Sequence, residues 1–208
     1  EFGSEAHSAV PQLTASLDDS EYAWAAAETL GQIGAKADDA APHLAKLLDS
    51  EDDFIRTKAA EALASIRSSN EMVLPALVVA LDDTVSAVRY SVVMAVEAFG
   101  PRAREAVPIV IGLVQHDSDN NVRCAAARTL GAIGEAPECV PVLTAAMQDD
   151  KNPWLRQRAA DAIGEIGPEA GPAVPALVAA LKGRPDFSRS SVVLALGKIG
   201  PNASDAIP

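Results

Sequence analysis

The sequence predicts an all-α fold, a right-handed α-solenoid (an α-α superhelix) of about six stacked two-helix repeats. One observation is the return of proline every 31 to 34 residues, at Pro11, Pro42, Pro75, Pro108, Pro141, Pro175 and Pro208. The other is that arginine, aliphatic and glycine positions recur in one register through the second half of each unit. A period in the thirties is typical of stacked repeats, in which each unit covers the apolar face of its neighbour.

The segment 107–134 shows how one unit is expected to fold. Pro108 stands in the first turn of a helix, where the missing N–H has no intrahelical partner to lose. Residues 117–120 form a turn rich in N-cap residues, and a second helix is predicted from about Asn121 to Ile133. Gly134 then ends this helix in a left-handed conformation. Each unit is therefore predicted to be a short helix, a tight turn and a longer helix.

The repeats also define the expected organisation of the chain. Residues 1–8 are expected to be a cloning scar followed by a disordered tail, and residues 9–208 a single repeat array. Its units are expected at about 9–39, 40–72, 73–106, 107–139, 140–173 and 174–206. Residues 207–208 match the start of a seventh unit, so the chain is expected to be part of a longer protein.

Composition restricts the classes of function. The formal net charge is −12 and no Lys/Arg-rich run exists, which disfavours nucleic acid because its phosphates repel an acidic chain. Acidity instead favours a protein partner with a basic patch. The longest apolar runs are far shorter than a membrane span. Two cysteines fifteen residues apart form neither a disulfide framework nor a zinc spacing, so a reducing, cytoplasmic location is expected.

No group of residues predicts catalysis. The three histidines fall in the tail, at a helix start and in a turn, and no metal, phosphate-binding or triad motif accompanies them. We therefore expect no catalytic residue, no metal site and no cofactor, and an enzyme is disfavoured.

The unit at 107–139 opens with Val-Pro, carries Val-Arg after an Asp in its middle and ends its second helix with Leu-Gly-x-Ile-Gly. Such units resemble armadillo-like HEAT repeats, in the short form found in phycobilisome lyases. The closing motif or its near match occurs at Leu30–Gly34, Leu130–Gly134, Ile163–Gly167 and Leu196–Gly200. The second unit departs most, because it lacks both glycines at 63–67. The resemblance covers about residues 9–208 and is specific for fold rather than for function.

Arginine at one repeat position and acidic residues at the ends of the first helices are the candidate structural residues. In similar repeats such side chains bond between neighbouring units, which implies an Asp–Arg ladder. A ligand-binding row of arginines is the alternative. The predicted ladder consists of Arg56, Arg89, Arg123, Arg156 and Arg189 with Asp49, Asp82 and Asp149.

The variable positions of the second helices are the candidate binding surface. Residue type changes from unit to unit there, which indicates solvent exposure, and in similar stacks this side lines the concave face. The residues expected to bind a partner are Trp24, Glu28, Tyr90, Met94, Arg128, Gln157 and Asp161. The alternative for Trp24 and Tyr90 is half-buried packing. Phe54, Trp154 and Phe187 share a turn position and are expected either to cover the rim of the helix interface or to form an exposed patch.

The leading interpretation is a scaffold that binds another protein through the concave face of its second helices. A first alternative, implied by the resemblance, is a subunit, catalytic or not, of a bilin lyase-like complex. A second alternative is a structural spacer within a larger regulatory protein.

Overall fold

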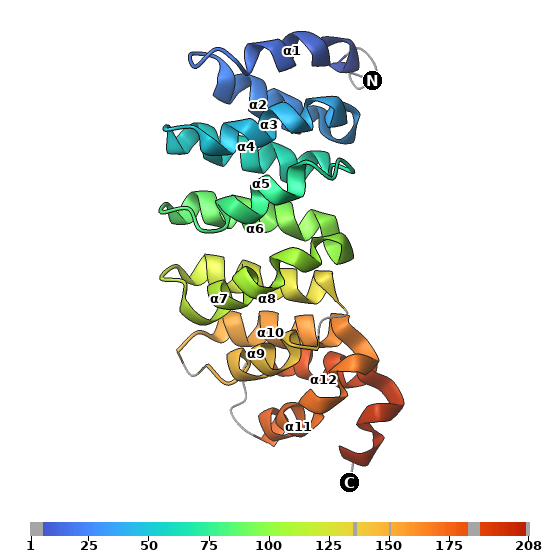
Figure 1. Cartoon of the computed structure of the whole chain (residues 1–208). Helices are drawn as coiled ribbons and strands as arrows, with labels where there is room; N and C mark the ends of the chain where they lie inside the picture. The colour runs from blue at the N-terminus through green and yellow to red at the C-terminus, as the bar shows by residue number, and fades with distance from the viewer. Residues whose placement is uncertain (1–5, 135–136, 150, 183–187, 207–208) are drawn as a thin grey trace. The chain divides into compact units, whose positions relative to one another are not determined.

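The computed structural model describes residues 6–134, 137–149, 151–182 and 188–206. These residues are predominantly helical and contain no strand, and their helices follow one another in pairs as a helical repeat solenoid (Figure 1). The chain divides into two compact units, residues 1–99 and 100–208.

The described part of the first unit forms three helical hairpins. Their first helices are short: α1 (Val10–Ser16), α3 (Ala41–Lys46, continued by the 3₁₀ turn η3, Leu47–Asp49) and α5 (Val73–Ala80). Their second helices are longer: α2 (Ala23–Ile33), α4 (Asp53–Ile66) and α6 (Ser86–Phe99). The 3₁₀ helices η1 (Ala6–Ala9) and η2 (Gly34–Ala40) precede α1 and α3. Helix α4 contacts both α2 and α6, so the second helices pack side by side.

The second unit repeats this arrangement. Its first helices are α7 (Val107–His116), α9 (Cys139–Ala146) and α11 (Val174–Lys182). Its second helices are α8 (Asn120–Ile133), α10 (Pro153–Ile166) and α12 (Ser188–Ile199). Three 3₁₀ helices each follow a second helix: η4 (Gly100–Ala106), η5 (Gly167–Ala173) and η6 (Gly200–Ala206). The first two lead into α7 and α11. Helix α10 packs between α8 and α12.

The ends of the helices follow from local chemistry. The side chains of Asp52, Asp119 and Asn152 accept a backbone N–H in the first turns of α4, α8 and α10, as N-cap residues do. Gly134 ends α8 with φ 79°, in the region that glycine enters at no steric cost. Arg67 ends α4 with φ 54° although it carries a side chain, a conformation that costs about 1–2 kcal/mol. The second repeat therefore also ends its second helix at a residue of positive φ, but with ψ 51° in place of the ψ of −114° at Gly134.

The core consists of small and aliphatic residues along the packed sides of the second helices. Ala59, Leu63, Ala126, Leu130 and Ile163 are completely buried. Their recurrence at two positions of the repeat means that each hairpin contributes the same strip of apolar surface to its neighbour.

The closest contacts join a glycine of one second helix to an alanine of the next. A Cβ atom built at Gly131 would lie 2.7 Å from Cα of Ala162, and one built at Gly31 or Gly164 would lie 3.0 Å from the alanine Cα opposite. Such short distances leave room for hydrogen only. The glycines that weaken α2, α8 and α10 are therefore retained because two backbones meet there.

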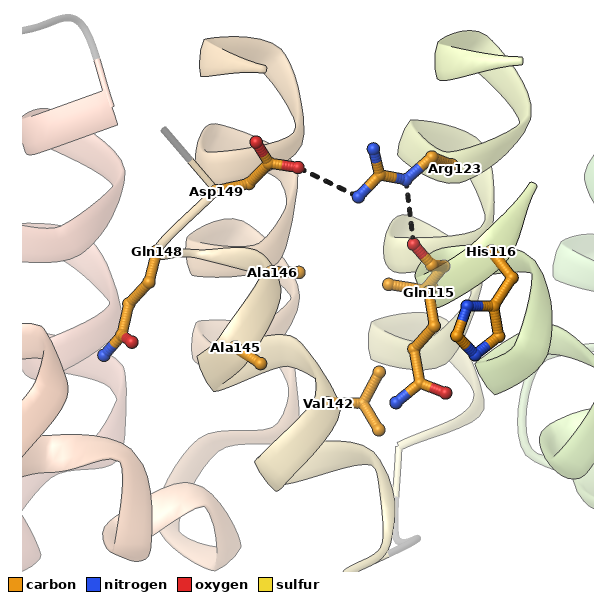
Figure 2. Close-up of a pocket in the computed structure, with 9 residues that line it drawn as sticks. Gln115, His116, Arg123, Val142, Ala145, Ala146, Gln148 and Asp149 are labelled. Atoms are coloured by element: carbon orange, nitrogen blue, oxygen red, sulfur yellow. Dashed lines mark hydrogen bonds and ion pairs between the residues drawn. The ribbon is translucent and has the colours of Figure 1, made fainter. Parts of the chain in front are cut away.

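Arginines of the second helices bind carboxylates in the turn of the following repeat. Arg56 donates through Nε and Nη2 to the two carboxylate oxygens of Asp83, at 2.7 and 3.1 Å. Arg123 Nη2 donates to Asp149 Oδ2 at 2.9 Å, and its Nε donates to the carbonyl of Val114 (Figure 2). Both guanidinium groups are mostly buried, so these bonds tie neighbouring repeats together.

The next arginine completes the same arrangement from the other side. Arg89 Nη1 donates to the backbone carbonyl of Asp83 at 2.8 Å, and Arg156 Nη1 donates to that of Asp149 at 2.7 Å. Each of these aspartates is thus bound by the arginine of the preceding repeat and by that of its own repeat. Among the described residues the Asp–Arg ladder includes Arg56–Asp83–Arg89 and Arg123–Asp149–Arg156.

The ladder differs from expectation in the turn before α6. We expected Asp82, but Asp82 is exposed and the neighbouring Asp83 binds Arg56. The reason is the turn, because Asp83 Oδ1 accepts the N–H of Val85 at 2.8 Å, and this bond holds the carboxylate at the start of the helix. Asp49 and Arg189, also assigned to the ladder, are exposed.

The ladder changes the acidity of its carboxylates. Burial alone would raise the pKa of Asp83, but hydrogen bonds from Arg56 and from the Val85 N–H outweigh it, so the pKa lies below its ordinary value. Burial alone would likewise raise the pKa of Asp149. Hydrogen bonds from the Lys151 N–H and from Arg123 outweigh it, so this pKa also lies below its ordinary value. Both aspartates are therefore ionised throughout the neutral range.

We predict opposite effects of one substitution at two equivalent glycines. Gly131→Ala should lower the free energy of unfolding by about 1–3 kcal/mol, because two helix backbones must separate. Gly197→Ala, at the same repeat position in α12, should raise it by up to about 1 kcal/mol, because no described atom lies within 4 Å and alanine favours the helix. Urea unfolding followed by circular dichroism measures both, and equal effects would contradict the packing argument.

We predict that Asp83→Asn lowers the free energy of unfolding at neutral pH by about 1–3 kcal/mol, because it removes a charge-assisted bond from a mostly buried arginine. A carboxyl whose pKa is lowered by folding stabilises the fold above its unfolded pKa, about 3.9, and loses this effect as pH falls through the folded pKa. The difference between parent and variant should therefore shrink as the pH falls below about 4.

Asp82→Asn is the matched control for this experiment, because the exposed neighbour bears the same charge. Its effect should stay within about 0.5 kcal/mol at every pH. A larger effect at residue 82 than at residue 83 would show that the ladder does not contribute to stability.

Candidate functional site

An aromatic pair lies on the surface of the first unit, across two neighbouring second helices. Trp24 of α2 is 40% exposed and Phe54 of α4 is 50% exposed. Their ring centroids are 5.8 Å apart, with the ring planes at 53°. The tryptophan from the variable positions and the phenylalanine from the turn positions thus form one exposed apolar patch.

Charged side chains border the aromatic pair. The ammonium nitrogen Nζ of Lys58 lies 3.2 Å from Glu28 Oε1 of α2 and 3.0 Å from Glu61 Oε2 of α4. It also lies 5.6 Å from the ring centroid of Phe54, within the range of a cation–π contact. The hydrogen bonds from Lys58 to Glu61 and Glu28 raise the pKa of the lysine above its ordinary value. We name Trp24, Phe54, Glu28, Glu61 and Lys58 the aromatic–acidic cluster.

The cluster includes two of the seven residues expected to bind a partner, Trp24 and Glu28. Tyr90, which is exposed, and Met94, which is half-buried, belong to α6 of the same unit, and α6 packs against α4. In the second unit Arg128 lies on α8, while Gln157 and Asp161 lie on α10, and all three are half-buried. Asp161 Oδ2 lies 3.8 Å from Nη1 of Arg158, a long ion pair on one helix face.

Lys58 and Glu61 are not among the seven residues expected to bind a partner, and for Phe54 the exposed patch, rather than the rim of a helix interface, is the alternative that its exposure favours. A signal for two of them was present. Glu61 follows Glu28 by one repeat, and Phe54 follows Trp24 by 30 residues, which puts both pairs on neighbouring second helices. Lys58 has no counterpart one repeat away in the cluster, so the repeat pattern does not indicate that it belongs there.

The remaining turn aromatics belong to the second unit. Trp154, in the first turn of α10, is 61% exposed. Phe187, which we expected beside it, lies outside the described residues.

Charge is divided unequally along the chain. Residues 1–99 carry 17 Asp and Glu against 6 Lys and Arg, a net charge of −11. Residues 100–208 carry 12 against 11, a net charge of −1. The aromatic–acidic cluster therefore lies in the strongly acidic unit.

A pocket of about 310 Å³ lies in the second unit between the end of α7 and the helix α9 (Figure 2). Its wall contains the ladder pair Arg123 and Asp149, and its rim contains the exposed side chains of Gln115, His116 and Gln148. Because Arg123 binds Asp149 and the Val114 carbonyl, its guanidinium is engaged within the fold. The pocket thus holds a structural ion pair next to neutral amides and aliphatic side chains.

The cysteines are poor nucleophiles in this structure. Burial raises the pKa of Cys139 to about 11 and also raises that of the half-buried Cys124. Thiolate is the reactive form, so both thiols are largely protonated at neutral pH. Within the described residues no group of three His, Cys, Asp or Glu side chains is arranged to hold a metal ion. Among the described helices, none has the length and apolar character needed to span a bilayer.

Comparison with solved structures shows the fold class. An engineered protein is 26% identical, with a TM-score of 0.73, over 93% of this chain and 97% of that chain. A designed armadillo repeat protein in complex with the peptide (KR)4 is 20% identical, with a TM-score of 0.70, over 92% of this chain and 99% of that chain. The complex of CpcE and CpcF of phycocyanin lyase from Nostoc sp. PCC7120 is 24% identical, with a TM-score of 0.54, over 97% and 82%.

Comparison with curated proteins gave no match. A family model described as HEAT repeats matches residues 10–97, 74–164 and 140–208, which together span nearly the whole chain. The repeated hairpins, the recurring glycine and arginine positions and these matches agree, and the chain belongs to the HEAT-repeat family.

Proposed function

We propose that the chain is a scaffold that binds an extended, Arg- and Lys-rich segment of another protein along the exposed residues of its second helices. The observation that carries this proposal is the aromatic–acidic cluster, in which the exposed rings of Trp24 and Phe54 contact each other and Lys58, beside Phe54, binds the carboxylates of Glu28 and Glu61. Tryptophan and tyrosine dominate the binding energy of many interfaces when they are partly exposed in the free protein.

The chemistry of the cluster favours a cationic side chain from the partner. A guanidinium group stacks on an aromatic face and donates to carboxylates at the same time, so one arginine satisfies both parts of the cluster. Lys58 already occupies this environment from within the chain, which demonstrates that a cation is accommodated there. A partner cation would share or displace the weak, exposed pairs of Lys58, each worth no more than about 1 kcal/mol.

Long-range charge supports the same class of partner. The net charge of −11 on residues 1–99 attracts a basic segment and speeds its association, an effect that salt weakens. The designed armadillo repeat protein that was solved with the peptide (KR)4 provides an example of a related fold holding such a segment.

A subunit of a bilin lyase-like complex is the alternative from another class of function. The likeness to the CpcE and CpcF complex supports the fold and not the activity, because the identity is 24%. An absorbance shift on mixing the chain with an open-chain tetrapyrrole would favour this alternative. If the chain bound neither ligand, the structural spacer would be favoured.

We predict that a fluorescein-labelled (KR)4 peptide binds the chain and that Trp24→Ala weakens its affinity at least about tenfold, the loss of about 1.4 kcal/mol or more that an interface hot spot shows. Fluorescence anisotropy measures the dissociation constant. Rising salt should weaken binding, because the attraction is electrostatic.

Trp154→Ala is the matched control, because it removes the other tryptophan from an exposed position in the near-neutral unit. It should change the affinity less than about twofold, below the threshold of an interface contact. Equal binding of an acidic peptide of the same length, or an unchanged affinity in Trp24→Ala, would contradict the proposal.

A further inference from the structure

Helices α8 and α10 of the second unit pack in the register of α2 and α4 of the first, with equivalent residues 100 positions apart. A Cβ atom built at Gly31 lies 3.0 Å from Cα of Ala62, and one built at Gly131 lies 2.7 Å from Cα of Ala162. The offset between the two helices is therefore the same in both units. The positions that form the aromatic–acidic cluster in the first unit consequently come together again in the second.

The equivalent surface of the second unit keeps an exposed aromatic side chain and an ion pair on one helix. Trp154, at the position of Phe54, is 61% exposed. Nη1 of Arg158, at the position of Lys58, lies 3.8 Å from Asp161 Oδ2, and the two side chains are 42% and 32% exposed. An aromatic ring thus again stands beside charged groups that solvent reaches.

The sign of the charge is reversed where α8 faces α10. Arg128, which is half-buried, occupies the position of Glu28. In the first unit this position faces residue 58 of the next second helix, since Lys58 Nζ lies 3.2 Å from Glu28 Oε1. Burial raises the pKa of Cys124 on α8, and the charge of Arg158 on α10 acts against this rise, so Arg158 lies close to α8. Two guanidinium groups from neighbouring helices therefore belong to one surface.

The charge of the whole helices agrees with this reversal. Helices α2 and α4 together carry three acidic and two basic side chains, a net charge of −1. Helices α8 and α10 together carry two acidic and four basic side chains, a net charge of +2. The acidic ones are Asp161 and Glu165, and the carboxylate of Glu165 lies near Gly131 of α8. Because the other two arginines of these helices belong to the ladder, Arg128 and Arg158 are the cations of this surface.

We propose that Arg128, Arg158 and Trp154 form a second binding site, which takes an extended, Asp- and Glu-rich segment of a protein partner. A guanidinium group donates two parallel hydrogen bonds to one carboxylate, and an exposed tryptophan adds apolar contact area beside it. Asp161 already holds a carboxylate near Arg158 from within the chain. Their long, partly exposed ion pair contributes no more than about 1 kcal/mol, so a carboxylate of the partner can replace it.

The unit that carries this site is nearly neutral, with a net charge of −1 on residues 100–208. An acidic segment is therefore not repelled there as it is by residues 1–99, whose net charge is −11. The site is separate from the aromatic–acidic cluster and does not depend on what that cluster binds.

Fluorescence anisotropy of a rhodamine-labelled (DE)4 peptide with the whole chain tests the proposal. At about 0.15 M salt the Debye length is about 8 Å, so repulsion by distant carboxylates is largely screened. The peptide should bind saturably, though more weakly than (KR)4, because the chain has a net charge of −12. Arg158→Glu should weaken its affinity at least about tenfold, because the variant removes the donor and places a like charge at the site.

Trp154→Ala should also weaken (DE)4 binding at least about tenfold, as loss of an interface hot spot does, although it changes no charge. This second variant keeps the test valid if Arg158→Glu does not fold, which circular dichroism melting shows. Arg104→Glu is the matched control, because it makes the same change of charge at an exposed arginine of η4, outside both helices of the site. It should change the affinity less than about twofold.

Three results would overturn the proposal: no saturable binding of (DE)4 to the parent, an equal loss of affinity in Arg104→Glu and Arg158→Glu, or an unchanged affinity in Trp154→Ala. The second of these would show that only the overall charge acts. Binding of (DE)4 that depends on Arg158 and Trp154 supports the proposal even if (KR)4 does not bind, a failure that would count against the aromatic–acidic cluster alone.

Discussion

Backbone contact between neighbouring second helices is the constraint on which the rest of this structure depends. Where Gly131 meets Ala162, there is no space for a further carbon atom, and the same pairing recurs at Gly31 and Gly164. Helices held this close leave one face of each second helix inside the stack and another outside. The inner positions must stay small or aliphatic, while the outer positions are free to vary. The ladder of arginines and aspartates then fixes the register between repeats at the turn end of the same helices.

This division explains how much the sequence could predict. Proline, glycine and aliphatic residues act through backbone geometry and packing that repeat identically, so their period was sufficient to predict the hairpins and the solenoid. The helix end at Arg67 shows that packing can impose a left-handed residue where glycine is missing. The ladder carboxylate of the first unit was assigned one residue too early, because which aspartate of a pair turns toward the arginine depends on the hydrogen bonds of the turn. A period does not contain that information.

The aromatic–acidic cluster was predictable only in part for a related reason. Repeat positions indicated which residues face outward, and Trp24 and Glu28 were identified in this way. Contacts between residues at different repeat positions, such as Trp24 with Phe54 or Lys58 with Glu28, depend on the offset between neighbouring helices and on side-chain direction. These are properties of the packed structure. The same offset brings aromatic surface and carboxylates from two helices into one patch, in the unit with a net charge of −11. Substitutions at these outer positions therefore change the surface while the stack stays unchanged.

The proposed recognition surface lies on the exposed residues of the second helices of the first unit. Hydrogen–deuterium exchange of the chain with and without the (KR)4 peptide tests this placement most directly, because it reports on every helix at once. We expect the peptide to slow exchange in α2 and α4, residues 23–33 and 53–66, and to leave α7 and α9 around the pocket of the second unit unchanged. Protection confined to α7 and α9, or the absence of protection in α2 and α4 at saturating peptide, would contradict the account.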